Sequence, residues 1–218
     1  MKLSKYKTWF FDCDGVLLDS NQLKSEAFYE VALPYGKKNA QALVEYNKRL
    51  GGVTRFEKFR YFFETILEKK TFEKELENAL NNFSALVCEK LINCPETSGA
   101  RDFLDSLPIN SKKYVVSGGA QTELKVIFKQ RGLDTYFDDI YGSPDSKEVI
   151  MRNKVRSPDM ECPAVFIGDS RYDYEVAWQF HLDFFFMTNY TEFKDWKSYF
   201  MDKRVKIIET FNALSFSK

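Results

Sequence analysis

The chain has 218 residues, of which 44% are hydrophobic and 29% are charged, and these values exclude a disordered or collagen-like protein. Its 32 lysines and arginines equal its 32 aspartates and glutamates, so a nucleic-acid partner is not expected. No stretch approaches the roughly 20 apolar residues of a membrane span, and acids interrupt the apolar start before it could act as an export signal. We therefore expect a cytoplasmic protein, whose four scattered cysteines are free thiols.

Short apolar runs bounded by polar turns predict six buried strands, one of them weaker than the others. They lie at residues 8–11, 114–116, 140–141 (the weaker run), 164–167, 184–187 and 205–208. Helix-sized segments separate most of them, which is typical of a parallel sheet covered by helices on both faces. The sequence therefore predicts an α/β fold with a doubly wound parallel sheet.

The interval between the first two strands breaks this alternation, because it contains helical patterns and no convincing strand. We expect an all-helical inserted domain at residues 20–95, with residues 1–19 and 96–218 forming the α/β core. Asp19 followed by Gln22 predicts a capping box at the start of the first inserted helix. Pro95 disfavours helix at the residue before it and predicts the end of the insertion.

Two acids, Asp12 and Asp14, follow the first strand directly. In an open α/β sheet, ligands bind just outside the carboxyl ends of the strands, so both carboxylates should face one crevice. A calcium loop of the EF-hand type would need an acid or amide at Val16, a glycine at Leu17 and a glutamate at Leu23. All three requirements fail, which excludes that reading.

Polar groups also follow the next three strands. Ser117 and Gly118 come after the second strand, where a hydroxyl and exposed backbone donors suit an anion. Lys147 begins a helix after the third strand, a position where a cation opposes the helix dipole. Asp169 follows the fourth strand, and Asp173 lies on the same face one turn later. Singly, each is as readily explained as a turn, a surface lysine or a helix cap.

Together, these groups indicate a site for a phosphate and a metal ion. Four carboxylates against one lysine leave a formal charge of −3, and a phosphate monoester would add about −2. Such a cluster must take up protons or recruit a cation. The single histidine excludes a metal site with two histidines, and an all-oxygen ligand set suits Mg²⁺.

The order of these motifs resembles the haloacid dehalogenase-like hydrolases. The resemblance rests on DCDGVLLDS from Asp12, VVSGG around Ser117, GSPDSK ending at Lys147, and GDSRYD, which contains Asp169 and ends at Asp173. Within that family, the chain is most similar to the subgroup of phosphatases, phosphoglycolate phosphatases and β-phosphoglucomutase-like enzymes that carry a helical cap. The resemblance implies a Rossmann-like core and a cap at residues 20–95.

The resemblance also implies catalytic roles for the first two acids. Asp12 would be the nucleophile that forms an aspartyl phosphate. Asp14 would protonate the leaving oxygen and later accept a proton from water. That role requires Asp14 to start protonated, which the surrounding negative charge should favour. Because halide-releasing members lack the second aspartate, dehalogenation is not expected.

The remaining motif residues would bind the metal ion, the phosphate and the substrate. Mg²⁺ would be held by Asp12, by the backbone carbonyl of Asp14 and by Asp169, with Asp173 either coordinating the ion or orienting a bound water. The phosphoryl oxygens would be held by Ser117, Gly118 and Lys147. In the cap, Arg49, Gly52 and Arg55 lie in a segment that resembles a substrate-contacting loop. A helix-joining turn with solvated arginines remains the alternative there.

These implications lead to one expected function and two alternatives. The expectation is a Mg²⁺-dependent phosphohydrolase of a small phosphorylated metabolite, with a sugar phosphate favoured. A β-phosphoglucomutase-like phosphomutase would use the same Asp12 and Asp14. A phospho-accepting signalling module would also combine acids, a hydroxyl and a lysine at strand ends, although a helical lid argues against it. The oligomeric state is not predicted.

Overall fold

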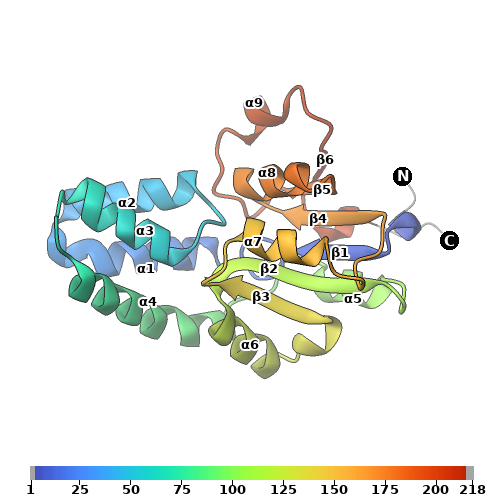
Figure 1. Cartoon of the computed structure of the whole chain (residues 1–218), viewed down its shortest axis with the longest axis horizontal. Helices are drawn as coiled ribbons and strands as arrows, with labels where there is room; N and C mark the ends of the chain where they lie inside the picture. The colour runs from blue at the N-terminus through green and yellow to red at the C-terminus, as the bar shows by residue number, and fades with distance from the viewer. Residues whose placement is uncertain (1–2, 215–218) are drawn as a thin grey trace.

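The computed structural model describes residues 3–214 of the chain (Figure 1). Its centre is a six-stranded, fully parallel sheet in the order β3-β2-β1-β4-β5-β6. The strands are β1 (Thr8–Phe11), β2 (Lys112–Ala120), β3 (Asp139–Ser143), β4 (Ala164–Gly168), β5 (Asp183–Met187) and β6 (Lys206–Ile208). The strand order reverses direction beside β1, and this switch point is where doubly wound sheets bind ligands.

Nine α-helices lie within residues 3–214. They are α1 (Asn21–Ala32), α2 (Lys37–Arg49), α3 (Arg55–Tyr61), α4 (Glu73–Asn93), α5 (Ala100–Ser106), α6 (Gln121–Gln130), α7 (Lys147–Lys154), α8 (Arg171–Gln179) and α9 (Trp196–Phe200). A π-helical turn, Phe62–Ile66, continues α3, and short 3₁₀ turns occur at Leu3–Lys5, Leu33–Tyr35, Asp134–Tyr136 and Phe211–Ala213. Within the described part of the chain, no helix has the length and apolarity that crossing a membrane requires.

Helices cover both faces of the sheet, so its strands are buried and apolar on both sides. Trp9 and Phe11 point into the larger core cluster with side chains of α5 and α6, whereas Phe10 points into the other cluster with side chains of α7 and α8. All three side chains are fully buried. The predicted α/β, doubly wound fold is therefore confirmed.

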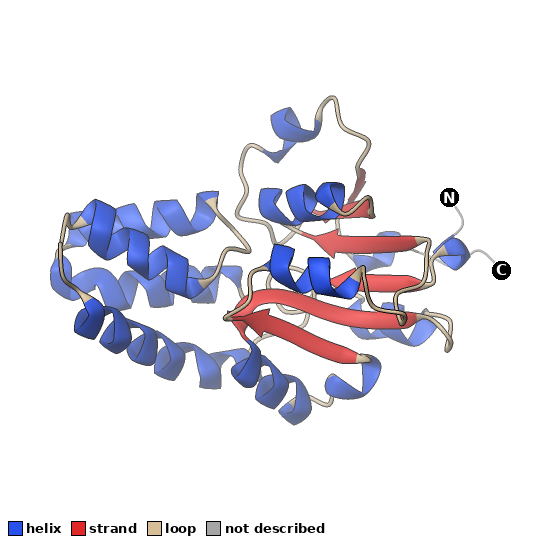
Figure 2. Cartoon of the chain, in the orientation of Figure 1, coloured by secondary structure: helices blue, strands red, loops and turns tan. Residues whose placement is uncertain are grey.

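A four-helix segment, α1 to α4, lies at the carboxyl edge of the sheet, where the strand arrowheads of Figure 2 point. Residues 21–93 are all described and contain no strand. Phe28, Phe59 and Phe83 form its core, with ring centroids 4.4 to 5.7 Å apart. We call this segment, residues 21–93, the helical insertion.

Two local predictions need correction, and a third is confirmed. The N-cap of α1 is Ser20 and not Asp19, and no side chain caps the helix, because the Ser20 hydroxyl donates to Asp14 instead. Strand β2 runs on to Ala120, so Ser117 lies inside the strand and not after it. Helix α4 ends at Asn93 with an extended Cys94, as Pro95 predicts.

Candidate active site

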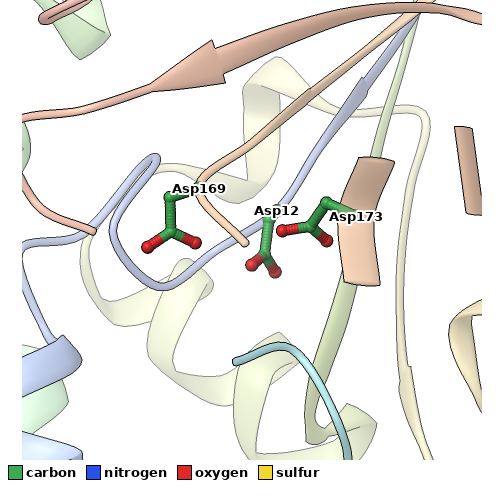
Figure 3. Close-up of side chains that lie close together, drawn as sticks. All are labelled: Asp12, Asp169 and Asp173. Carbon is green, nitrogen blue, oxygen red and sulfur yellow. The ribbon is translucent and has the colours of Figure 1, made fainter. Parts of the chain in front are cut away.

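Three carboxylates converge beyond the carboxyl ends of β1 and β4 (Figure 3). Asp12, Asp169 and Asp173 each offer a ligand oxygen within 4.8 Å of the others, and all three residues are buried. The strand register places Phe11 beside Ile167, and the backbone N–H of Asp12 donates to the Ile167 carbonyl at 2.9 Å. The pairing of β1 with β4 therefore brings together acids that lie far apart in the sequence.

Asp173 is oriented by the start of α8. Ser170 is the N-cap, and its backbone N–H and hydroxyl donate to Asp173 Oδ2 at 3.1 and 2.7 Å. The Ser170 hydroxyl in turn accepts from the Asp173 backbone N–H at 3.2 Å, which completes a capping box. The other carboxylate oxygen, Oδ1, remains directed at the cluster, where it accepts from Lys147.

Lys147 lies between two of these acids. It is the first residue of α7, and its Nζ lies 2.8 Å from Asp12 Oδ1 and 2.5 Å from Asp173 Oδ1. Its side chain is fully buried. Burial opposes the charged form, but the two carboxylates outweigh it and raise the pKa of Lys147. These ion pairs explain why a cation occupies the first turn of a helix.

The electrostatics of the cluster suit a divalent cation. Burial raises the pKa of Asp12 to about 7, although Lys147 opposes this rise. Burial, followed by repulsion from Asp12 and Asp173, raises the pKa of Asp169 well above its usual value. Three carboxylates with one ammonium leave a formal charge of −2, and every donor is an oxygen. The residues therefore fit Mg²⁺.

Asp14 lies apart from this cluster, against the helical insertion. Its carboxylate accepts from Lys24 of α1 at 2.5 Å and from the Ser20 hydroxyl at 2.6 Å. Burial acts to raise the pKa of Asp14, but Lys24 and Ser20 outweigh burial and lower it. The prediction that Asp14 is protonated in this environment is therefore wrong, because its nearest charge is positive.

The expected phosphate-binding backbone meets the insertion. Ser117 is fully buried, and its hydroxyl accepts from the Gly119 backbone N–H at 3.1 Å. Gly118 packs against Gly52 so closely that a side chain there would collide with the Gly52 carbonyl. Gly52 has φ +82°, and a Cβ on it would lie 3.4 Å from Lys147 Nζ. The predicted cap residue Gly52 therefore lies directly over the acid cluster.

The two other predicted cap residues, Arg49 and Arg55, both line the small cavity between sheet edge and insertion. Arg55 is 8% exposed, and its guanidinium donates to both carboxylate oxygens of Glu123 on α6, at 2.7 and 3.0 Å, and to Ser84 at 2.8 Å. Arg49 is exposed, and its guanidinium lies 5.7 Å from the ring centroid of Tyr46. Arg55 thus joins the insertion to the core, whereas Arg49 has no such ion pair among the described residues.

Sequence reasoning missed several polar residues of the cavity wall, among them Lys24, Asn47, Lys58 and Glu192. Lys58 Nζ donates to Asn47 Oδ1 at 2.7 Å, Asn47 donates to Ser25 at 2.9 Å, and Ser25 donates to Glu192 at 2.7 Å. Only Lys24 left a signal in the sequence, because its spacing of four from Ser20 places both on one helical face.

The cavity has a volume of about 60 Å³, a few times the roughly 10–15 Å³ that one water molecule needs. Contacts that hold the insertion over it include Lys24 with Asp14, Arg55 with Glu123, and Ser25 with Glu192.

Comparison with known protein families gives one match. The model of the family described as "Haloacid dehalogenase-like hydrolase" matches residues 9–187, more than half of the chain. No curated protein matches the sequence significantly.

Solved structures share the fold at low sequence identity. A haloacid dehalogenase-like family hydrolase from Streptococcus pneumoniae is 18% identical with a TM-score of 0.70, covering 97% of this chain and 98% of its own. The β-phosphoglucomutase of Clostridium difficile is 16% identical with a TM-score of 0.73, covering 97% and 94%. YfnB of Bacillus subtilis, solved with bound magnesium, is 20% identical with a TM-score of 0.64, covering 96% of both chains.

Proposed function

Because the chain belongs to the haloacid dehalogenase-like hydrolases, we propose that it is a Mg²⁺-dependent phosphatase of a small phosphorylated metabolite, with a sugar phosphate as the favoured class. The observation that carries this proposal is the convergence of Asp12, Asp169, Asp173 and Lys147 at the sheet edge beneath the helical insertion. A phosphate ester brought there would meet a nucleophile, a fixed cation and a place for a divalent ion.

Asp12 attacks phosphorus and becomes an aspartyl phosphate, which divides one displacement into two easier ones. Its Oδ1 accepts from Lys147 at 2.8 Å and from the Cys13 backbone N–H at 2.7 Å, so the direction of the carboxylate is fixed before the substrate arrives. Lys147, Ser117 and Gly118 hold the phosphoryl oxygens through an ammonium, a hydroxyl and a backbone donor.

Asp14 supplies the proton to the leaving oxygen and later removes one from the attacking water, work typically worth about 10²–10⁴-fold. The Lys24 contact keeps Asp14 ionised in the closed, substrate-free protein. Because Lys24 favours the ionised form, Asp14 must lose this contact before it can carry the proton that the first step needs.

Mg²⁺ would be held by Asp12, the backbone carbonyl of Asp14, Asp169 and Asp173. When bound, the ion would neutralise charge on the transferring phosphoryl group. The −2 charge of the acid cluster and its oxygen-only donors support this assignment.

The helical insertion acts as a cap. We assign residues 20–95 to the cap domain, and residues 1–19 and 96–218 to the core domain. The small volume of the closed cavity supports a cycle in which the cap opens to admit substrate and closes to exclude water.

The test is a screen for phosphate release from phosphorylated metabolites with and without Mg²⁺. We expect release that EDTA abolishes and that falls at least about 1,000-fold in Asp12→Asn, because that variant lacks the nucleophile. Asp102→Asn, an exposed acid on α5, is the matched control and should retain full activity. Retained activity in Asp12→Asn would contradict the proposal, and an isomerised sugar phosphate without phosphate release would indicate a phosphomutase.

A further inference from the structure

The insertion contributes to the cavity wall a buried cation, Lys58, that has no carboxylate partner within the described residues. Lys58 is 5% exposed and lines the cavity, and within residues 3–214 its ammonium donates one hydrogen bond, to the amide oxygen of Asn47 at 2.7 Å. Within residues 3–214, no carboxylate lies within ion-pair distance of it. An ammonium has three donors, so its hydrogen-bonding capacity is not filled by the protein.

On balance the surroundings of Lys58 disfavour its charge, although the ring centroid of Phe28 lies 5.5 Å from its ammonium and Asp14 and Glu192 oppose the effect. Burial, and then the ammonium of Lys24, lower the pKa of Lys58 to about 7. The nearby acids already have other partners: Asp14 accepts from Lys24, and Glu192 accepts from Ser25 and lies 3.5 Å from Lys48. Burying a cation without a counter-ion is destabilising, so this arrangement makes sense if the missing anion arrives from outside.

Lys58 is also held in place. Asn47, which accepts from Lys58, donates to Ser25 at 2.9 Å, and Ser25 donates to Glu192 of the core at 2.7 Å. Asn47 and Ser25 are both buried. The ammonium is therefore preorganised at the wall of the same cavity that contains Asp12 and Asp14, and a single molecule in this cavity would meet both regions.

We infer that Lys58 is a specificity-determining residue, which binds a second anionic group on the phosphate ester, either a carboxylate or a second phosphate. This inference rests on the proposed phosphatase function and narrows its substrate class to phosphate esters with two anionic groups. A charge-assisted hydrogen bond of this kind should favour such a substrate by about 10- to 100-fold over an analogue in which the second group is uncharged.

Two matched substrate pairs test the inference and separate the sources of the anion. 3-Phosphoglycerate and glycerol 3-phosphate share a three-carbon chain and differ by a carboxylate; fructose 1,6-bisphosphate and fructose 6-phosphate differ by a phosphate. We expect the wild type to show the larger kcat/KM for the doubly anionic member of at least one pair. Lys58→Met should abolish that preference by raising KM, while kcat/KM for the member with one anionic group stays within about twofold.

Three further variants or measurements separate a specificity role from a structural one. Thermal unfolding should show Lys58→Met to be at least as stable as the wild type, because the variant removes a buried charge without a counter-ion. Asn47→Asp should also reduce the preference, since it places a carboxylate beside an unchanged lysine. Lys38→Met, which changes an exposed lysine of α2 outside the cavity, should keep the preference.

Equal kcat/KM for both members of both pairs in the wild type would overturn the inference, as would an unchanged preference in Lys58→Met. If no ester releases phosphate, the proposed phosphatase function fails, and calorimetric binding to Asp12→Asn protein with Mg²⁺ decides the inference alone. Tighter binding of a doubly anionic member, lost on adding Lys58→Met, supports it; equal binding within both pairs overturns it.

Discussion

Two buried lysines have opposite surroundings: Lys147 lies in the acid cluster at the sheet edge, which we call the floor, and Lys58 lies in the cavity wall formed by the insertion, which we call the roof. Lys147 on the floor lies between the carboxylates of Asp12 and Asp173, which raise its pKa. Lys58 on the roof contacts an amide and lies near a second lysine, and its pKa falls to about 7. The floor thus carries its own counter-ions, whereas the roof lacks one. A buried charge without a partner is evidence for a ligand, because folding alone would not favour it.

Lys147→Met should have the largest effect, because it leaves Asp12 and Asp173 without their shared cation. We expect activity to fall by about 10²–10³-fold and the free energy of unfolding by about 3–5 kcal/mol, measured by phosphate release and urea denaturation. Lys58→Met removes an equally buried lysine and should not lower stability. Equal destabilisation by Lys147→Met and Lys58→Met would contradict the idea that only Lys147 has counter-ions in the protein.

The pH dependence of stability, compared between the wild type and Lys58→Met, should show the lowered pKa of Lys58. Its pKa is about 7 in the folded protein and 10.5 ordinarily, so between these values the unfolded chain binds the additional proton. Stability of the wild type relative to Lys58→Met should therefore rise by roughly 3 kcal/mol from pH 7 to pH 10. Urea denaturation of both proteins measures this, since Lys24 and Asp14 are common to both. A difference that does not change with pH would contradict the lowered pKa.

Magnesium should stabilise the protein through the acid cluster at the sheet edge, and this gain should not depend on Lys58. At a concentration of 100 times its Kd, Mg²⁺ should add about 2.7 kcal/mol to the free energy of unfolding. Asp169→Asn should lose most of this gain, because it removes one of three converging carboxylates, whereas Lys58→Met should retain it. Thermal unfolding with and without MgCl₂ measures both. An undiminished gain in Asp169→Asn would place the ion elsewhere.

Breaking the ion pair between Arg55 of the insertion and Glu123 of the core should have a smaller effect on activity. Glu123→Gln keeps the shape of the side chain but removes the carboxylate to which the Arg55 guanidinium donates at 2.7 and 3.0 Å. Because Glu123 does not line the cavity, we expect kcat/KM to fall only about fivefold, or about 1 kcal/mol, through weaker closure of the insertion. Glu123→Asp serves as the control that retains the charge, and a larger loss there than in Glu123→Gln would argue against this reason.

The floor could be predicted from the sequence, and the roof largely could not. In a parallel sheet every strand delivers its following residues to one edge, so Asp12, Asp169 and Lys147 could be brought together without knowing any side-chain contact. Lys58 and Asn47 lie on helices whose rotation depends on tertiary packing, and a lysine on such a helix usually faces water. The expected protonation state of Asp14 is wrong for the same reason. The actual state depends on Lys24, whose direction is set by the packing of α1 and cannot be seen from the charges at the sheet edge.

The close packing of Gly118 against the Gly52 carbonyl has a practical consequence. The backbone of Gly118 does not lie in the left-handed region, so alanine is conformationally acceptable there. One added methyl group would collide with that carbonyl and hold the insertion away from the sheet edge, without changing any ionisable side chain. Gly118→Ala is therefore a variant with which to crystallise the separated arrangement that the proposed cap movement requires.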